Sequence, residues 1–251
     1  MSALLDQATA TVLDPGMLVA VAMTAIAGVL RGYSGFGTAI LLAPIYALLW
    51  GPRAGVPVML LMELVTSAQL LPRSIRTADH RVVLPMGITA CIATPVGAWV
   101  LLTADQEVLR RSIGAMVLGF GLLLMSGWRY HGARPGPLNI AIGVVSGLMK
   151  GSTGMAGPPV ILYLLAGQEA ARQHRDNLIL YFAMIGIVAV VPPILGGIVD
   201  EATLVRAAVL LPVLYLCVRI GVRLFGVVSD RWYRRVAFLL LVATGLTALL
   251  L

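Results

Sequence analysis

The sequence predicts an all-α membrane protein that crosses the bilayer several times, and three observations support this fold class. Hydrophobic residues make up 59% of the 251 residues and charged residues only 12%, and the mean hydropathy is +0.95. The apolar residues form long runs that do not alternate with polar ones, which favours membrane helices over a β-barrel. A glycine-rich stretch with a central cation occurs twice, which indicates an internal duplication.

The apolar runs divide into two halves with the same pattern. Each half has a short run, a glycine-rich break, a second short run and then three longer runs. In the first half the runs cover 17–30, 38–50, 56–71, 82–102 and 108–127. In the second half they cover 138–149, 158–166, 178–198, 204–225 and 236–251, and the polar segment 128–137 joins the halves. We therefore predict a single membrane domain, 1–251, made of repeat one, 16–127, and repeat two, 137–251.

The duplicated stretch reads AGVLRGYSGFG at 27–37 and SGLMKGSTGMAG at 146–157. Arg31 aligns with Lys150, and small residues around both cations align at the same offset. These are Gly28, Gly32, Ser34 and Gly35 in the first copy and Gly147, Gly151, Thr153 and Gly154 in the second. A later pair of anchors, Gly97 with Arg110 and Gly221 with Arg234, extends the alignment over both halves.

The charges of the connections predict how the repeats are oriented. If each break is the tip of a pair of short helices, three further spans follow it and the two halves are inverted. With the N-terminus outside, the outer connections 51–53, 103–107 and 199–201 are mostly acidic. The inner connections then hold the arginines, as the positive-inside rule requires. These are Arg73, Arg76, Arg81, Arg129, Arg134, Arg172, Arg175, Arg231, Arg234 and Arg235.

One alternative treats each broken segment as a single long span, which makes the repeats parallel. It places the basic segments 172–175 and 231–235 outside, so the charge pattern rejects it. Whether the short helices stop at mid-membrane or cross at a tilt stays open. The N-terminus has no Lys or Arg before the first apolar run, so we expect no cleaved signal peptide. We expect the protein in the inner membrane.

The two breaks predict an anion-binding site near the bilayer centre. Glycines let the chain turn and let a ligand approach the backbone, and helix N-termini near Thr38 and Pro158 favour anions. Arg31 and Lys150 add full positive charges. The predicted substrate-binding residues are Arg31, Gly32, Ser34, Gly35, Gly37, Thr38, Lys150, Gly151, Ser152, Thr153 and Gly154. In the alternative interpretation, both cations reach an interface and the glycines only allow close helix packing.

Glu63 is the one carboxylate well inside an apolar run, VMLLMELVT. It could pair with Arg31 or Lys150, carry a coupling proton, or serve as a structural hydrogen-bonding partner. The spans contain neither a cluster of metal ligands nor a set of catalytic groups, so we expect no metal, no cofactor and no enzymatic activity. Cys91 and Cys217 lie in apolar runs and are expected to be buried thiols.

The breaks GYSGFGTAILLAP at 32–44 and GSTGMAGPP at 151–159 are glycine-rich stretches followed by proline, duplicated in a short membrane chain. In this the sequence resembles the TauE/SafE family of sulfite and organosulfur-anion exporters over its whole length. The resemblance implies a secondary transporter that exports sulfite, sulfonates or related organic acids. An anion channel and a non-transporting membrane assembly protein remain the alternatives.

The composition also limits the kinds of partner that the chain can have. The formal net charge of +7 comes from cations in short connections, so we expect lipid rather than nucleic acid around this chain. The sequence carries no ATP-binding motif, so transport would be coupled to protons or to a counter-anion. Formation of a homodimer stays open.

Overall fold

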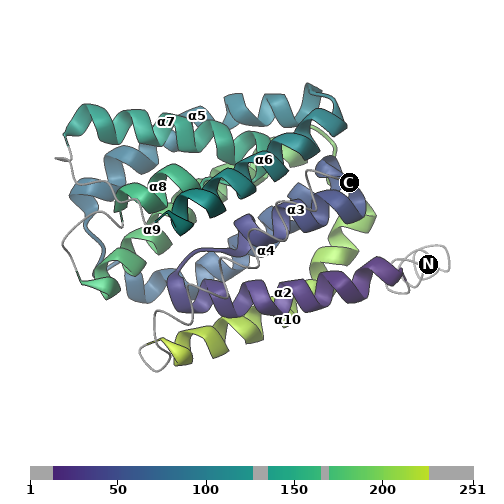
Figure 1. Ribbon diagram of the computed structural model, residues 1–251, viewed down its shortest axis with the longest axis horizontal. Helices are drawn as coiled ribbons and strands as arrows, with labels where there is room; N and C mark the ends of the chain where they lie inside the picture. Colours follow the sequence, from purple (N-terminus) through teal and green to yellow (C-terminus); the bar gives the residue numbers. More distant parts are fainter. Residues whose placement is uncertain (1–13, 127–134, 165–169, 226–251) are drawn as a thin grey trace.

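The computed structural model describes residues 14–126, 135–164 and 170–225, and this part of the chain is α-helical (Figure 1). The predicted last span, 236–251, and most of the joint 128–137 lie outside the described residues. The described helices are α2 (Pro15–Ser34), α3 (Thr38–Trp50), α4 (Pro52–Ser74), α5 (His80–Thr103), α6 (Gln106–Met125), α7 (Gly136–Thr153), α8 (Gly157–Leu164), α9 (Ala171–Leu195) and α10 (Glu201–Leu224).

Five of the described helices are long and apolar enough to cross a membrane: α2, α4, α5, α9 and α10. This confirms the all-α, multi-pass fold class. Two details of the prediction were wrong. The helix before the first break does not end near Leu30 but continues through Arg31 to Ser34. Four arginines predicted in connections lie near helix ends instead: Arg73 in α4, Arg81 in α5, and Arg172 and Arg175 in α9. Glycine in a long apolar helix does not end it when a neighbouring helix packs against that glycine.

The two breaks are short and have the same local geometry. Gly35 ends α2 with φ 83°, and its N–H donates to the carbonyl of Arg31 at 2.9 Å. Gly154 ends α7 with φ 75°, and its N–H donates to the carbonyl of Lys150 at 2.9 Å. Glycine adopts this left-handed conformation without a steric penalty. Both cations therefore lie in the last turn of a helix, where the helix dipole favours positive charge.

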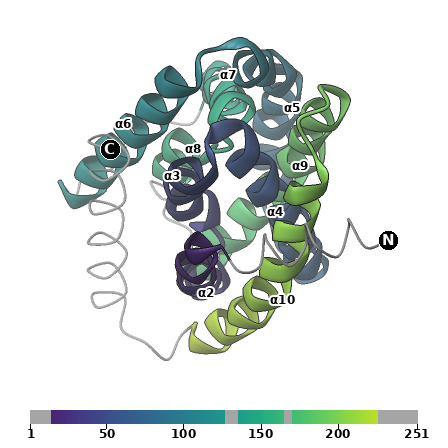
Figure 2. The ribbon, with the colours of Figure 1, turned by 90° about the vertical axis from the view of Figure 1, so that its right-hand side faces the viewer.

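Helices of the two predicted halves pack on each other reciprocally. Figure 2 shows α2 beside α10 at one side of the bundle and α7 beside α5 at the other, with α3, α4 and α8 between them. A Cβ on Gly32 would lie 2.1 Å from the Val218 carbonyl oxygen of α10, and one on Gly151 would lie 2.0 Å from the Thr94 carbonyl oxygen of α5. The inverted repeat stays a prediction.

Alanine at Gly32 or Gly151 is expected to destabilise the protein by about 1–3 kcal/mol, because a Cβ there would overlap the backbone of a facing helix. Gly119→Ala and Gly186→Ala are matched controls, since a Cβ at either position meets nothing within 4 Å. Thermal unfolding of purified protein in detergent measures the difference. Equal melting temperatures for all four variants would contradict the close packing.

Side-chain contacts tie several connections together at one end of the bundle. The indole nitrogen of Trp50 donates to the Asp14 carboxylate at 3.4 Å, and Arg53 donates to the Ala104 carbonyl oxygen at 3.0 Å. The guanidinium group of Arg206 lies 4.7 Å from the Trp50 ring centroid. The start of α2 and the α3–α4, α5–α6 and α9–α10 connections therefore share this end.

At the opposite end, the start of α9 is bound to the connection between α4 and α5. Asp176 accepts hydrogen bonds from the Ser74 hydroxyl at 2.7 Å and the Thr77 hydroxyl at 2.6 Å. The Asn177 side-chain oxygen accepts from the Asp79 backbone N–H at 2.7 Å. The polar residues of this end thus hold α4 and α9, which pack against each other, in a fixed register.

Candidate functional site

The candidate site is built around Glu63, which lies at the middle of α4 and is only 4% exposed. One carboxylate oxygen, Oε1, accepts a hydrogen bond from the Thr38 hydroxyl at 2.9 Å and lies 3.7 Å from Nη1 of Arg31. The other oxygen, Oε2, is ion-paired with Nζ of Lys150. The carboxylate is therefore shared by the two cations that the duplicated stretch aligns.

Arg31 reaches this carboxylate from the last turn of α2. Its Nη2 donates to the Ser67 hydroxyl at 3.0 Å, and its guanidinium carbon lies 5.3 Å from the Phe182 ring centroid. The residue is 1% exposed, and its Nε has no hydrogen-bond partner among the described residues. Arg31 is thus held by one ion pair, one hydroxyl and one aromatic face, and its Nε–H remains available as a hydrogen-bond donor.

Lys150 approaches from α7, on the other side of Glu63, and is also 1% exposed. Two buried cations share one carboxylate, so the group of Arg31, Glu63 and Lys150, here called the buried charge cluster, carries a formal net charge of +1. Moving charges out of water is costly unless they are paired. A cluster with one uncompensated positive charge can bind an anion. The anion can also take the place of the Glu63 carboxylate beside the two cations.

The predicted hydroxyl groups do not all reach this cluster. Thr38 does, because it starts α3 beside Glu63. The other three hydroxyls donate to carbonyl oxygens of their own helices: Ser34 to Leu30 at 2.8 Å, Ser152 to Leu148 at 2.9 Å and Thr153 to Met149 at 2.8 Å. A Ser or Thr near a helix end commonly donates to the preceding turn in this way.

The predicted glycines take three different places. Gly35 and Gly154 form the left-handed ends of α2 and α7. Gly37, with φ 115°, is the N-cap of α3 and comes directly before Thr38. Gly32 and Gly151 lie in helix–helix contacts. The structure therefore brings together Arg31, Thr38, Lys150 and Glu63, and it places the glycines where they allow these helix ends to meet.

Sequence reasoning missed two members of the site. Ser67 lies one helical turn after Glu63 on α4, so helical spacing from the single buried carboxylate could have found it. Phe182 lies on α9, and nothing in the local sequence pointed to it. Arg175 was expected in a connection, yet its Nη2 donates to the Gly32 carbonyl oxygen at 2.7 Å and its Nε to the Tyr33 carbonyl oxygen at 3.2 Å.

Comparison with known proteins gives a consistent result. The sequence profile of the family described as "Sulfite exporter TauE/SafE" matches residues 20–248. A protein of Cupriavidus necator named "Probable sulfite/organosulfonate exporter TauE" is 29% identical over 202 residues, which cover 77% of each chain. No solved structure matches. The chain belongs to the TauE/SafE family, whose members are membrane transporters rather than enzymes.

Proposed function

We propose that this protein exports sulfite or small organosulfonates across the inner membrane, and that the buried charge cluster is its substrate site. The relative from Cupriavidus necator is named for export of the same anions. The observation that carries the proposal is the single Glu63 carboxylate shared by Arg31 and Lys150 at the middle of a membrane-length helix. Ionisable residues at such depth are costly and commonly mark a transport path.

Glu63 acts as the internal anion of the empty transporter. It occupies the position between the two cations where a sulfite or sulfonate group would be held best, since the guanidinium group and the ammonium group both favour oxyanions. A bound substrate leaves the cluster with two negative charges against two positive ones. When the substrate displaces it from Arg31 and Lys150, the Glu63 carboxylate loses its counter-charges, and it can move aside or take up a proton, which couples transport to protons.

The start of α3 adds a second feature that favours an anion. Thr38 is the first residue of α3, and its hydroxyl reaches Glu63, so the N-terminal end of this helix lies at the carboxylate. Helix N-termini present free N–H groups and a partial positive charge to an anion. A substrate in this place would be bound by Arg31, Lys150, Thr38 and the backbone of the first break, 35–37.

The orientation follows from the charges of the two ends. With the N-terminus outside, single cysteines at Gln106 and Ala202 are expected to react with an impermeant thiol reagent added to intact cells. A cysteine at Arg76, an exposed residue of the opposite end, is expected to react only after the cells are opened. Cys91 and Cys217 are replaced in the background. The reverse pattern would show that the N-terminus is inside.

Flux through purified protein tests the function itself. Proteoliposomes are loaded with sulfite, methanesulfonate, sulfate or acetate, and efflux is followed with and without a pH gradient. We expect efflux of sulfite and methanesulfonate, stimulated by a pH gradient, and little of acetate. Efflux rates that equal those of vesicles without the protein for all four anions would refute the proposal.

A further inference from the structure

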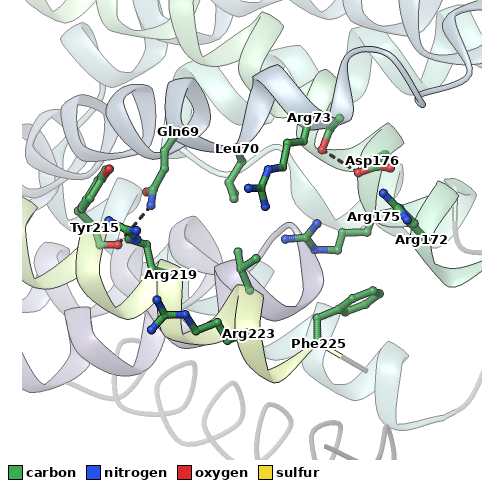
Figure 3. Close-up of a pocket in the computed structure, with 12 residues that line it drawn as sticks. Gln69, Leu70, Arg73, Arg172, Arg175, Asp176, Tyr215, Arg219, Arg223 and Phe225 are labelled. Atoms are coloured by element: carbon green, nitrogen blue, oxygen red, sulfur yellow. Dashed lines mark hydrogen bonds between the residues drawn. The ribbon is translucent and has the colours of Figure 1, made fainter. Parts of the chain in front are cut away.

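A second set of cations, separate from the buried charge cluster, lines a cavity of about 590 Å³. The cavity lies between α4, α9 and α10, at the end of the bundle opposite Trp50 and Asp14. Figure 3 shows guanidinium groups around one open space, contributed by Arg73, Arg172, Arg175, Arg219 and Arg223. We refer to it as the arginine cavity.

The positive charge of this cavity is not neutralised by its own lining. Arg73, Arg172, Arg219 and Arg223 are exposed, and none forms an ion pair within the described residues. Among the described residues of the lining, Asp176 supplies the one carboxylate, and it already accepts hydrogen bonds from Ser74 and Thr77. Several uncompensated arginines around a concave surface attract anions from solution.

Arg175 joins the arginine cavity to the buried charge cluster. It lines the cavity, and its guanidinium group donates to the carbonyl oxygens of Gly32 and Tyr33. These two residues directly follow Arg31 at the end of α2. An anion in the cavity that attracts the Arg175 guanidinium would therefore act on the helix end that presents Arg31 to Glu63.

The lining also indicates the chemical class of the ligand. Planar guanidinium groups bind sulfonate, sulfite or phosphate oxygens in pairs. Leu70, Val222 and Phe225 add apolar surface beside the arginines. This combination suits an oxyanion head attached to a short organic body, and the volume leaves room for more than a bare sulfite ion.

We propose that the arginine cavity is a second anion site, open to the cytoplasm, that loads organosulfonates before they reach the buried charge cluster. This proposal rests on the proposed export function and on the N-terminus lying outside. The cavity raises the local concentration of the anion, and Arg175 passes it toward the break. The same head-group chemistry occurs in anionic phospholipids, so binding is measured with and without phosphatidylglycerol to distinguish a soluble anion from a lipid.

The test uses the double variant Arg73→Gln with Arg219→Gln, because neither side chain has an ion pair to lose. Arg81→Gln is the matched control, an exposed arginine of the same end that does not line the cavity. Calorimetry with methanesulfonate in detergent counts the sites, and uptake into everted membrane vesicles gives the KM from the cytoplasmic face. Uptake is measured at low and high salt.

We expect two sites in the wild-type protein and one in the double variant. Its KM should rise about 10-fold at low salt, with an unchanged maximal rate and a smaller difference at high salt. Lys150→Gln should weaken binding at the buried charge cluster and keep the cavity site. Wild-type binding and KM in the double variant would overturn the proposal.

Two further outcomes separate the causes of failure. A cavity site for methanesulfonate that is lost when phosphatidylglycerol is added would assign the cavity to a lipid head group and overturn the loading role. Two sites in calorimetry but no flux of any anion would refute the export function while keeping the cavity as an anion site.

Discussion

Replacing Lys150 with glutamine is expected to weaken anion binding by roughly 10- to 100-fold while the protein stays folded. Glu63 would keep Arg31 at 3.7 Å as its counter-charge, so no buried charge is left alone. The cluster would, however, become neutral and lose the surplus positive charge that attracts an anion. A charge-assisted contact is worth about 1.5–3 kcal/mol, which corresponds to this range of affinities.

Calorimetry with methanesulfonate measures the effect, because the charge of a sulfonate does not change over the accessible pH range. Arg31→Gln is expected to give a loss in the same range, since Lys150 stays paired with Glu63. Ser112→Ala is a control for the substitution of a polar residue outside the buried charge cluster, since within the described residues its hydroxyl donates to the Val108 carbonyl oxygen of its own helix. Wild-type affinity in both charge variants would place the substrate elsewhere.

The sequence predicts much of this fold because the signals are local. The free-energy cost of burying polar groups in lipid is enough to interpret the long apolar runs, the duplicated break and the placement of the arginines. The structure confirms the all-α, multi-pass architecture within the described residues. It places Arg31 and Lys150, aligned by sequence alone, on the same carboxylate, which was one of three roles that the sequence left open for Glu63.

What the sequence could not predict depends on contacts between distant segments. Gly32 resembles a helix break in sequence but stays helical, because α10 packs against it at a distance that only glycine permits. Arg175 resembles part of a basic connection, yet it lies in the first turns of α9 and binds the end of α2. Phe182 became part of the site only through the packing of α9 against the other helices. Such pairings have no signature in a single sequence.

Replacing Glu63 with glutamine is expected to have the opposite effect on binding to the loss of either cation. Two buried cations would remain without a counter-charge, and breaking a buried pair in this way costs about 3–5 kcal/mol. The empty protein should therefore melt at a clearly lower temperature. An anion would then supply the missing charge without competing with a carboxylate, so methanesulfonate should bind more tightly and restore much of the lost thermal stability.

The substitution Glu63→Gln is also expected to change the pH dependence of methanesulfonate binding. If Glu63 takes up a proton when the anion displaces it from Arg31 and Lys150, methanesulfonate binding should strengthen as pH falls in the wild-type protein. In Glu63→Gln, binding should be independent of pH. Thr38→Val is the comparison for the pH dependence alone, because it removes a neutral hydrogen bond to the same carboxylate and leaves all three charges in place. It should keep the wild-type pH dependence. Thermal shifts and calorimetry from pH 5 to 8 measure both effects. If Glu63→Gln binds more weakly and keeps the wild-type pH profile, Glu63 is a structural partner of the two cations, and the coupling proton is carried by another group.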